Sequence, residues 1–368
     1  MKYIFFALNI FCVLLAHLLL FLIWRDFFGI DSRYVQVAVS YLLLGSVSLL
    51  AIAPLLMHWR DSVFSRSLYL VLSLWMGVML NTALIALVML IADWFAKSFG
   101  IEVSSSLRPY AIGILPILIL LPEAWAAQSF RIKRRTVYIN GLPPIWEGKD
   151  IVHISDIHLG PIWRQRHFDR LVAAVNGLQP DATFITGDLF DGMDTDFHWF
   201  HPRQFQAEKG VYYSIGNHDL NLGTQRIKDL LSNSGIEIMD NRLLAVDGLQ
   251  ILGLTCHYEG KLDVKSEILS QIGYERALPS ILMYHEPKDI PAARSAGINL
   301  QLSGHTHAGQ MFPLNLLAML LFKGFSYGLF RLKEYTISVT AGAGTWGPPL
   351  RLGSRSEIVV LRLKTANK

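Results

Sequence analysis

The sequence predicts two domains of different class: an N-terminal domain of four membrane-spanning helices, residues 1–130, and an α/β domain, residues 131–368. The chain of 368 residues is 52% hydrophobic and 17% charged, whereas a soluble globular chain carries about a quarter charged residues. The deficit lies in the first part, because residues 1–130 hold only 13 of the 62 charged side chains. Beyond residue 130, short strand-like runs alternate with polar, helix-like stretches.

Four apolar runs in the first domain are long enough for bilayer spans, which need about 20 residues each. Runs 3–24, 34–59 and 67–92 contain no charged residue, and run 109–130 contains one, Glu123. Each should be a helix, since backbone groups in lipid must be hydrogen-bonded internally. Buried helices of a soluble protein are the alternative, but 26 consecutive uncharged residues exceed what a globular core needs. The first run has no clear cleavage site, which favours an uncleaved helix over a signal peptide.

Lysine and arginine residues near the ends of the spans predict the orientation. Four stand on one side: Arg25, Arg33, Lys97 and Arg108. Seven stand on the other: Lys2, Arg60, Arg66, Arg131, Lys133, Arg134 and Arg135. We therefore expect a multi-pass inner (cytoplasmic) membrane protein with both termini and the second domain in the cytoplasm.

Two polar residues stand out inside the predicted spans, Asn81 and Glu123. A carboxylate within a membrane is a functional candidate by default. Because Glu123 follows Pro122 near the end of its run, the sequence favours an interfacial position with the side chain reaching toward water.

The second domain reads as an α/β fold whose sheet is at least partly parallel. Its strand-like runs are rich in Val, Ile, Thr and Tyr and are bounded by Gly, Asp or Asn; they cover 151–155, 182–186, 211–215, 251–255, 281–284, 336–340 and 358–363. Intervening helices are predicted over 168–178 and 224–232. Ligands of such sheets bind at the carboxyl ends of strands, so the residues that follow each strand are the candidates for function.

Five strand ends carry carboxylates, imidazoles and one amide. In chain order they read Asp156-Ile157-His158, Gly187-Asp188-Leu189-Phe190-Asp191, Gly216-Asn217-His218-Asp219, His285, and Gly304-His305-Thr306-His307. Each motif alone is weak, since a turn, a helix cap or a packed histidine would explain it. Together, imidazole and carboxylate ligands suit hard-to-borderline divalent ions, and two such ions suit displacement at phosphorus. The glycines permit close approach of backbone and ligand.

Other site types are disfavoured. The two cysteines, Cys12 and Cys256, cannot form a disulfide framework or a thiolate metal site. The net charge of +4 is mild, and no nucleic-acid partner is expected. His153, His167, His198, His201 and His257 are predicted to be packing or surface residues, although His257 follows a strand and is a candidate for substrate contact.

The ordered motifs closely resemble those of the calcineurin-like metallophosphoesterases, whose pattern D-x-H, G-D-x-x-D, G-N-H-D/E, H, G-H-x-H is present in full. The resemblance covers roughly 151–363 and includes the Gly344–Pro349 region and Gly353, common in membrane-associated bacterial members. It implies a two-sheet α/β sandwich flanked by helices. It also implies one metal held by Asp156, His158, Asp188 and His307, and a second held by Asp188, Asn217, His285 and His305, with Asp188 bridging.

The implied chemistry is phosphoester hydrolysis by a hydroxide that bridges two divalent ions, Mn²⁺ by preference, with Fe, Zn or Mg as alternatives. The leaving oxygen needs a proton, and His218 is the natural donor because the ordinary pKa of histidine lies near neutrality. The family pattern assigns Asp191 to hold that imidazole. Asp219 is expected to serve the local turn.

One departure bears on the substrate. Family members that cleave phosphoprotein monoesters usually have an arginine after G-D-x-x-D, and here that position is Gly192. Without a bidentate cation for a dianion, a phosphodiester or pyrophosphate is favoured over a phosphoprotein. Arg164 or Arg351 could supply the cation instead.

Residues 311–330 form an apolar segment between His307 and the strand at 336–340, with a single charge, Lys323. Twelve large apolar residues in twenty exceed one helix face, so the segment is predicted to form an apolar hood that admits acyl chains to the metals. The alternative is an excursion that only completes the core. The twelve are Phe312, Leu314, Leu316, Leu317, Met319, Leu320, Leu321, Phe322, Phe325, Tyr327, Leu329 and Phe330.

The sequence thus predicts a membrane-anchored, metal-dependent phosphohydrolase. Its predicted partners are the lipid bilayer and a phosphodiester or pyrophosphate substrate. If the apolar segment forms a hood, that substrate is expected to be lipid-linked. Two alternatives stay open. One is a tethered phosphodiesterase for a soluble, nucleotide-like substrate. The other is a non-catalytic membrane sensor or scaffold, which the intact motif residues disfavour because a dead domain would be free to lose several of them.

Overall fold

The chain divides into two compact units. The computed structural model describes residues 2–101, 106–193, 197–255 and 266–366. The first unit is Met1–Trp125 with Gly347–Leu350, and the second is Ala126–Trp346 with Arg351–Lys368.

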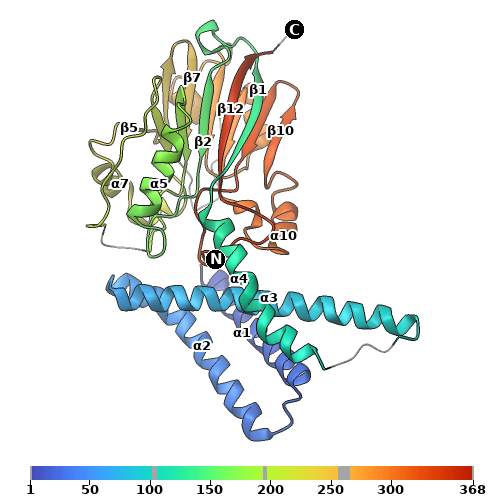
Figure 1. Ribbon diagram of the computed structural model, residues 1–368. Coiled ribbons are helices and arrows are strands. Elements are labelled where there is room, and N and C mark those ends of the chain that lie inside the picture. Colours follow the sequence, from blue (N-terminus) through green and yellow to red (C-terminus); the bar gives the residue numbers. More distant parts are fainter. Residues whose placement is uncertain (1, 102–105, 194–196, 256–265, 367–368) are drawn as a thin grey trace. The chain divides into compact units, whose positions relative to one another are not determined.

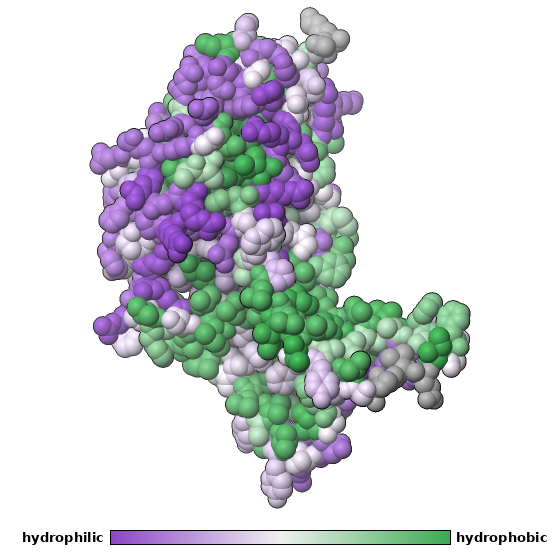
Figure 2. Space-filling model, viewed as in Figure 1, coloured by the Kyte–Doolittle hydropathy of each residue, from purple (hydrophilic) through white to green (hydrophobic). Residues whose placement is uncertain are grey.

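The first unit is helical. Its helices are α1 (Lys2–Phe28), α2 (Arg33–Trp59), α3 (Val63–Ser98) and α4 (Arg108–Gln128; the last turn belongs to the second unit). All four predicted runs therefore form helices. α3 begins at a capping box, in which the side chain of Ser62 accepts a hydrogen bond from the Ser65 amide. Figure 2 shows mainly hydrophobic residues over these helices and a mainly hydrophilic visible face on the second unit.

The prediction of four membrane spans is corrected to two candidates. Among the described residues, α3 and α4 are long and apolar enough to cross a bilayer, whereas the apolar part of α2, Arg33–Leu49, is shorter. The side chains of residues 1–13 lie outside the description, so the run at 3–24 offers too few described residues for a span.

The side chain of Glu123 does not reach toward water, contrary to the prediction. Glu123 is 2% exposed and accepts a hydrogen bond from the Asn81 side-chain amide at 3.1 Å. The two polar residues that stood out in the sequence therefore pair with each other between α3 and α4, because a buried carboxylate requires a donor.

The second unit contains two six-stranded sheets, as the α/β prediction required. The first has the order β1-β12-β2-β3-β4-β5 and the second β10-β11-β9-β8-β7-β6. In chain order the strands are β1 (Arg131–Ile139), β2 (Asp150–Ile154), β3 (Ala182–Thr186), β4 (Val211–Ser214), β5 (Ile236–Ile238), β6 (Arg242–Val246), β7 (Leu249–Leu254), β8 (Ser280–Tyr284), β9 (Leu300–Ser303), β10 (Gly328–Leu332), β11 (Tyr335–Val339) and β12 (Glu357–Thr365).

Parallel pairing aligns the strand ends that matter. β2, β3 and β4 run parallel in the first sheet, with Ile154 beside Ile185 and Ile185 beside Tyr213. β8 and β9 run parallel in the second sheet. The carboxyl ends within each group therefore share one edge.

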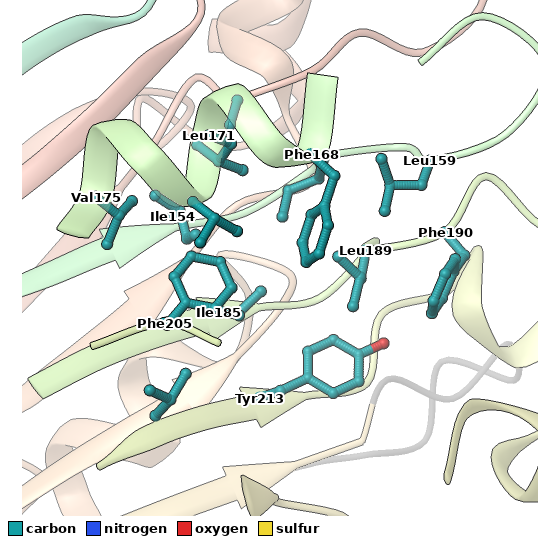
Figure 3. Packing of buried hydrophobic residues seen from close by; sticks show 14 of the residues in the cluster. Ile154, Leu159, Phe168, Leu171, Val175, Ile185, Leu189, Phe190, Phe205 and Tyr213 are labelled. Atoms are coloured by element: carbon teal, nitrogen blue, oxygen red, sulfur yellow. The ribbon is translucent and has the colours of Figure 1, made fainter. Parts of the chain in front are cut away.

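The core has three layers of apolar side chains. Residues such as Ile151, Phe184, Ile251 and Met283 pack between the sheets. The other face of the first sheet is covered by α5 (Gln165–Asn176), whose Phe168, Leu171 and Val175 are shown in Figure 3. The other face of the second sheet is covered by α8 (Ser266–Gln271) and α9 (Ile290–Ala296). The remaining helices are α6 (Asp219–Leu222), α7 (Thr224–Leu230), α10 (Leu314–Leu321), η1 (Pro144–Trp146) and η2 (His307–Gly309). The result is the two-sheet sandwich that the family resemblance implied (Figure 1).

All seven predicted strands with stated bounds are present within two residues at each end. The other five strands, β1, β5, β6, β9 and β10, had no predicted bounds. β1 was missed because its first residues read as a basic linker. It forms the edge of its sheet beside β12, where charged side chains can face water and discourage edge-to-edge pairing.

The apolar segment at 311–330 divides into two parts. Phe325, Leu329 and Phe330 pack against the core, as the alternative reading held. By contrast, α10 is largely uncovered: among its residues only Ala318 is buried, and Leu320 and Leu321 are 72% and 67% exposed.

Candidate metal centre

All seven predicted metal ligands come together at the carboxyl ends of five strands. Asp156 and His158 follow β2, Asp188 follows β3, Asn217 follows β4, His285 follows β8, and His305 and His307 follow β9. The first sheet thus contributes four ligand candidates and the second sheet three. The site lies where the two sheets present their strand ends to each other.

The backbone at these residues is unusual. Asp156, His158, Asp188, His305 and His307 all have positive φ, between 50° and 69°. This region is unfavourable for residues with a Cβ and persists only where surrounding structure enforces it. Each left-handed residue turns the chain sharply as it leaves its strand, and such strain typically gathers at functional sites.

Two glycines let the loops approach closely. A Cβ at Gly216 would collide with the carboxylate and amide of Asp188, and a Cβ at Gly304 would collide with Ser155 and the Asp156 carboxylate. The glycines in the G-N-H-D and G-H-x-H motifs therefore make room for carboxylates from a neighbouring strand end.

One group of candidate ligands consists of Asp156, His158 and His307. The Nε2 atoms of the two histidines are 3.1 Å apart, and His307 Nε2 is 3.5 Å from Asp156 Oδ1. All three side chains are buried. Two imidazole nitrogens and a carboxylate oxygen that converge at such distances form a suitable pocket for a cation.

The second group consists of Asp188, His285 and His305. His285 Nδ1 lies 2.7 Å from the Thr186 carbonyl, to which it must donate, so Nε2 of the neutral ring carries a lone pair. That Nε2 is buried, 3.0 Å from Asp188 Oδ2, and has no hydrogen-bond partner of proper geometry. The amide oxygen of Asn217 lies 2.9 Å from His305 Nδ1 and brings a fourth donor to this group.

Asp188 faces both groups. Its Oδ2 is 3.0 Å from His285 Nε2 and 3.9 Å from His158 Nε2, and its Oδ1 accepts the main-chain amide of His218 at 2.9 Å. This is the position that a bridging carboxylate requires.

The charges at the site are strongly coupled. Burial opposes protonation of His285, but the carboxylates of Asp188 and Asp156 outweigh it and raise the pKa of His285 to about 10. Burial, together with the neighbouring His158 and Arg351, holds the pKa of His307 well below its usual value. The site therefore concentrates two buried carboxylates and several imidazoles, a donor set without thiolate that fits Mn, Fe, Zn or Mg.

His218 forms a further group of possible ligands with His158 and Asp188, and Asp191 stands beside it. His218 Nδ1 donates to the main-chain carbonyl of Asp191 at 3.0 Å, whereas the Asp191 carboxylate is 3.9 Å away. The carboxylate lies nearer to His158 Nδ1, at 3.4 Å. The contact expected from the Asp191 side chain is thus made by its main chain. With Nδ1 occupied, His218 Nε2 is the nitrogen left for proton transfer, and the ring is partly exposed.

Asp219 joins two of the ligand loops. Its carboxylate accepts main-chain N–H groups of Asp188 at 2.7 Å, Gly216 at 2.9 Å and Phe190 at 3.0 Å. The predicted turn role is confirmed and extends to the neighbouring loop, which Asp219 holds in place.

Arg351 does not stand where it could grip a phosphate. It is 2% exposed and donates to the carbonyls of Ala341 at 2.6 Å, Gly344 at 2.7 Å and His307 at 3.2 Å. Arg164, the other arginine considered, lies over the Trp199 ring at 4.3 Å. Sequence reasoning missed the supporting role of Arg351, since its partners are backbone atoms of loops remote in sequence.

Two further histidines are packing residues, as predicted. His153 contacts Thr186 Oγ1 at 2.9 Å and Ser338 Oγ at 3.3 Å, and burial lowers its pKa to about 3. His167 contacts the Ala343 carbonyl at 3.1 Å, and burial lowers its pKa to about 4. Both are therefore neutral. Cys256 and His257 lie outside the described residues.

Comparison with known proteins agrees with this geometry. Residues 149–309 match the family model described as calcineurin-like phosphoesterase. An uncharacterised metallophosphoesterase of Campylobacter jejuni is 34% identical over 61% of this chain and 61% of its own length. A bovine transmembrane protein with a metallophosphoesterase domain is 35% identical over 71% of this chain and 63% of its own length. The metallophosphoesterase YkuE of Bacillus subtilis, also uncharacterised, is 31% identical over 63% of this chain and 85% of its own length.

The two-sheet sandwich and the carboxylates and imidazoles at its strand ends are the features of a metallophosphoesterase. The chain belongs to the calcineurin-like phosphoesterase family, which confirms the resemblance read from the motifs. The chain spans less than two thirds of the length of the first two of these relatives.

Proposed function

We propose that the protein is a membrane-anchored, two-metal hydrolase of phosphodiesters or pyrophosphates. The observation that carries the proposal is the convergence of seven buried or partly buried ligand candidates from two sheets, with the buried His285 Nε2 3.0 Å from Asp188 Oδ2 and without a hydrogen bond of proper geometry.

In this proposal Asp156, His158, Asp188 and His307 hold one ion, and Asp188, Asn217, His285 and His305 hold the other. Mn²⁺ is the proposed ion. When bound, a pair of divalent ions activates water and neutralises charge that develops on the phosphoryl oxygens. The chain's own residues supply orientation: Thr186 fixes the His285 tautomer and Asp219 fixes the loop that carries Asp188.

His218 is the proposed general acid. Its Nδ1 is held by the Asp191 carbonyl, so that Nε2 can deliver a proton to the leaving oxygen. The ring lies 4.9 Å from His158, centroid to centroid, which places it beside the ligands without being buried among them.

The proposed substrate is a diester or pyrophosphate rather than a phosphoprotein. Gly192 offers no cation, and the Arg351 guanidinium is taken up by carbonyls. A lipid-linked substrate is supported by α10, whose exposed leucines end at Phe322, with the Phe322 ring 5.8 Å from the His305 ring. Apolar surface thus extends to the edge of the metal centre.

One observation favours a second candidate, a soluble nucleotide-like substrate. Trp346 is 51% exposed, and its ring lies 6.1 Å from the ring of His218, the proposed general acid. Gln310 fixes its main chain through two hydrogen bonds of 3.0 and 3.1 Å. An exposed indole carried by a hydrogen-bonded main chain is a suitable stacking surface for a base.

Activity of the purified full-length protein in detergent with Mn²⁺ tests these proposals. The panel would contain bis(p-nitrophenyl) phosphate, p-nitrophenyl phosphate, a soluble dinucleotide and a long-chain lipid pyrophosphate. We expect the diester to turn over faster than the monoester. Faster turnover of the monoester would contradict the substrate class, and two bound metals without turnover on any substrate would favour the sensor or scaffold.

The proposed location is the inner membrane, with the second unit in the cytoplasm. The candidate spans α3 and α4 and the basic residues Arg131–Arg135 support it. A reporter fused after Lys368 is expected to give a cytoplasmic signal. A periplasmic signal would reverse the orientation or require an odd number of spans.

A further inference from the structure

A cavity of about 510 Å³ lies between the first residues of β1 and α10. Three cationic residues line it, and so do apolar residues of α10 and β10; the main ones are Arg131, Lys133, Arg355, Leu316, Met319 and Phe330. None of the seven ligand candidates lines it. The cavity is therefore separate from the metal centre.

The charge of the cavity is positive. Glu357 is its only carboxylate among the lining residues, and Glu357 is 2% exposed and engaged with Tyr327, Thr340 and the Ala341 amide. Lys133 Nζ is 3.7 Å from that carboxylate. Arg355 contacts Ser129 at 3.0 and 3.2 Å. Arg131 is exposed at the start of β1, so one cation remains at the mouth with water-accessible surface.

The apolar wall continues out of the cavity along α10. Leu316 and Met319 line the cavity and are 49% and 48% exposed, and Leu317, Leu320 and Leu321 are exposed beyond them. A soluble domain does not usually leave a contiguous leucine surface in water. Basic groups next to an apolar helix face match the two halves of an anionic amphiphile.

The polypeptide links this cavity directly to a candidate membrane span. The last three residues of α4 belong to the second unit, and their carbonyls are held within it: Ala126 accepts from the Ser356 amide at 3.1 Å, Ala127 from Ser356 Oγ at 2.7 Å, and Gln128 from Arg170 at 2.8 Å. Arg131 follows Gln128 by three residues, at most about 10 Å of extended chain.

We propose that this cavity binds an anionic membrane phospholipid, with the phosphate beside Arg131, Lys133 and Arg355 and the acyl chains along Leu316, Met319 and the exposed face of α10. The lipid serves as a docking ligand and not as substrate.

The test uses full-length protein in neutral detergent and dihexanoyl phosphatidylglycerol below its micelle concentration, with binding followed by native mass spectrometry. Arg131→Gln should weaken binding about fivefold, since one basic residue near an anionic lipid contributes that much. Arg134→Gln is the matched control, because Arg134 has the same charge in the same strand but pairs with Asp150 at 3.8 Å. Leu316→Ser tests the apolar half independently.

Asp188→Asn should retain the lipid, because the cavity is not the metal centre. Four results would overturn the proposal: equal binding of dihexanoyl phosphatidylcholine, competition by glycerol 3-phosphate at similar concentration, equal loss in Arg131→Gln and Arg134→Gln, or loss of the lipid in Asp188→Asn. Loss of the lipid in Asp188→Asn would place it at the metals instead, without affecting the proposed hydrolase.

Discussion

The metal centre and α10 lie in the same unit and depart from ordinary protein surfaces in opposite ways. At the metal centre, Asp156, Asp188 and His285 are ionisable side chains with at most 1% exposure. On α10, Leu320 and Leu321 are more than two thirds exposed. One region buries charge and the other exposes hydrocarbon.

Buried charge and exposed apolar surface are both unfavourable unless a bound ion or an apolar phase compensates for them. Buried carboxylates need compensating charge, and the left-handed backbone at five ligand candidates adds local strain. Exposed leucines need an apolar phase. We infer that cations complete the first region and lipid completes the second. The predictions below separate the two.

The largest effect is expected from Asp188→Asn. The change removes the carboxylate that faces both ligand groups, so binding of at least one ion and nearly all turnover should be lost. Wild-type protein should contain two metals per chain by elemental analysis. Asp169→Asn is the matched control, because Asp169 is a surface residue of α5 paired with Arg203. Activity preserved in a metal-free Asp188→Asn protein would refute the two-metal site.

His218→Asn should retain both metals and lower kcat by roughly 10²–10⁴, the usual contribution of a general acid. The loss should shrink with p-nitrophenol as leaving group, which needs less protonation. His201→Asn serves as the control, because His201 is an exposed residue. An equal loss across leaving groups of different pKa would remove His218 from this role.

The metal centre could be predicted from the sequence because its ligands sit in short motifs at strand ends. The motifs gave residue types and order, and parallel pairing brings such ends together. What the sequence could not give is the long-range support: Arg351 binds three carbonyls of distant loops, and Asp191 uses its main chain where its side chain was expected.

The helical unit was harder to predict in detail. Hydropathy located four helices, but it could not reveal that the side chain of Glu123 in α4 contacts Asn81 in α3, 42 residues earlier in the sequence. For the segment at 311–330, an apolar hood and a core excursion both require an apolar composition, so the sequence could not separate them. Only the packing distinguishes the uncovered helix α10 from the core strand β10 that follows.

Arg351→Lys should destabilise the second unit by about 3 kcal/mol, because the single ammonium nitrogen of lysine cannot reach carbonyls that are served by two separate guanidinium nitrogens, and buried acceptors are left unpaired. Thermal unfolding in detergent would measure this, with the exposed Arg203→Lys as control. KM should be unchanged at a temperature where the variant is folded. A raised KM with an unchanged Tm would instead mean that Arg351 contacts the substrate.

The smallest and most selective effect is expected from α10. Leu320→Ser combined with Leu321→Ser should not unfold the protein, because both side chains are already mostly exposed and leave no cavity. If acyl chains of the substrate lie on these leucines, each loses about 1 kcal/mol of apolar contact. KM for a long-chain substrate should then rise about tenfold or more, while a short soluble diester is unaffected. Leu278→Ser, at a 41% exposed leucine outside α10, is the control.

Phe322→Ser is tested separately, since the Phe322 ring contacts His305. If Phe322 shapes the metal site, the variant would change the turnover of both the long-chain and the short substrate. Equal effects of the leucine pair on long and short substrates would show that α10 does not select for lipid, and would leave the soluble substrate as the better candidate.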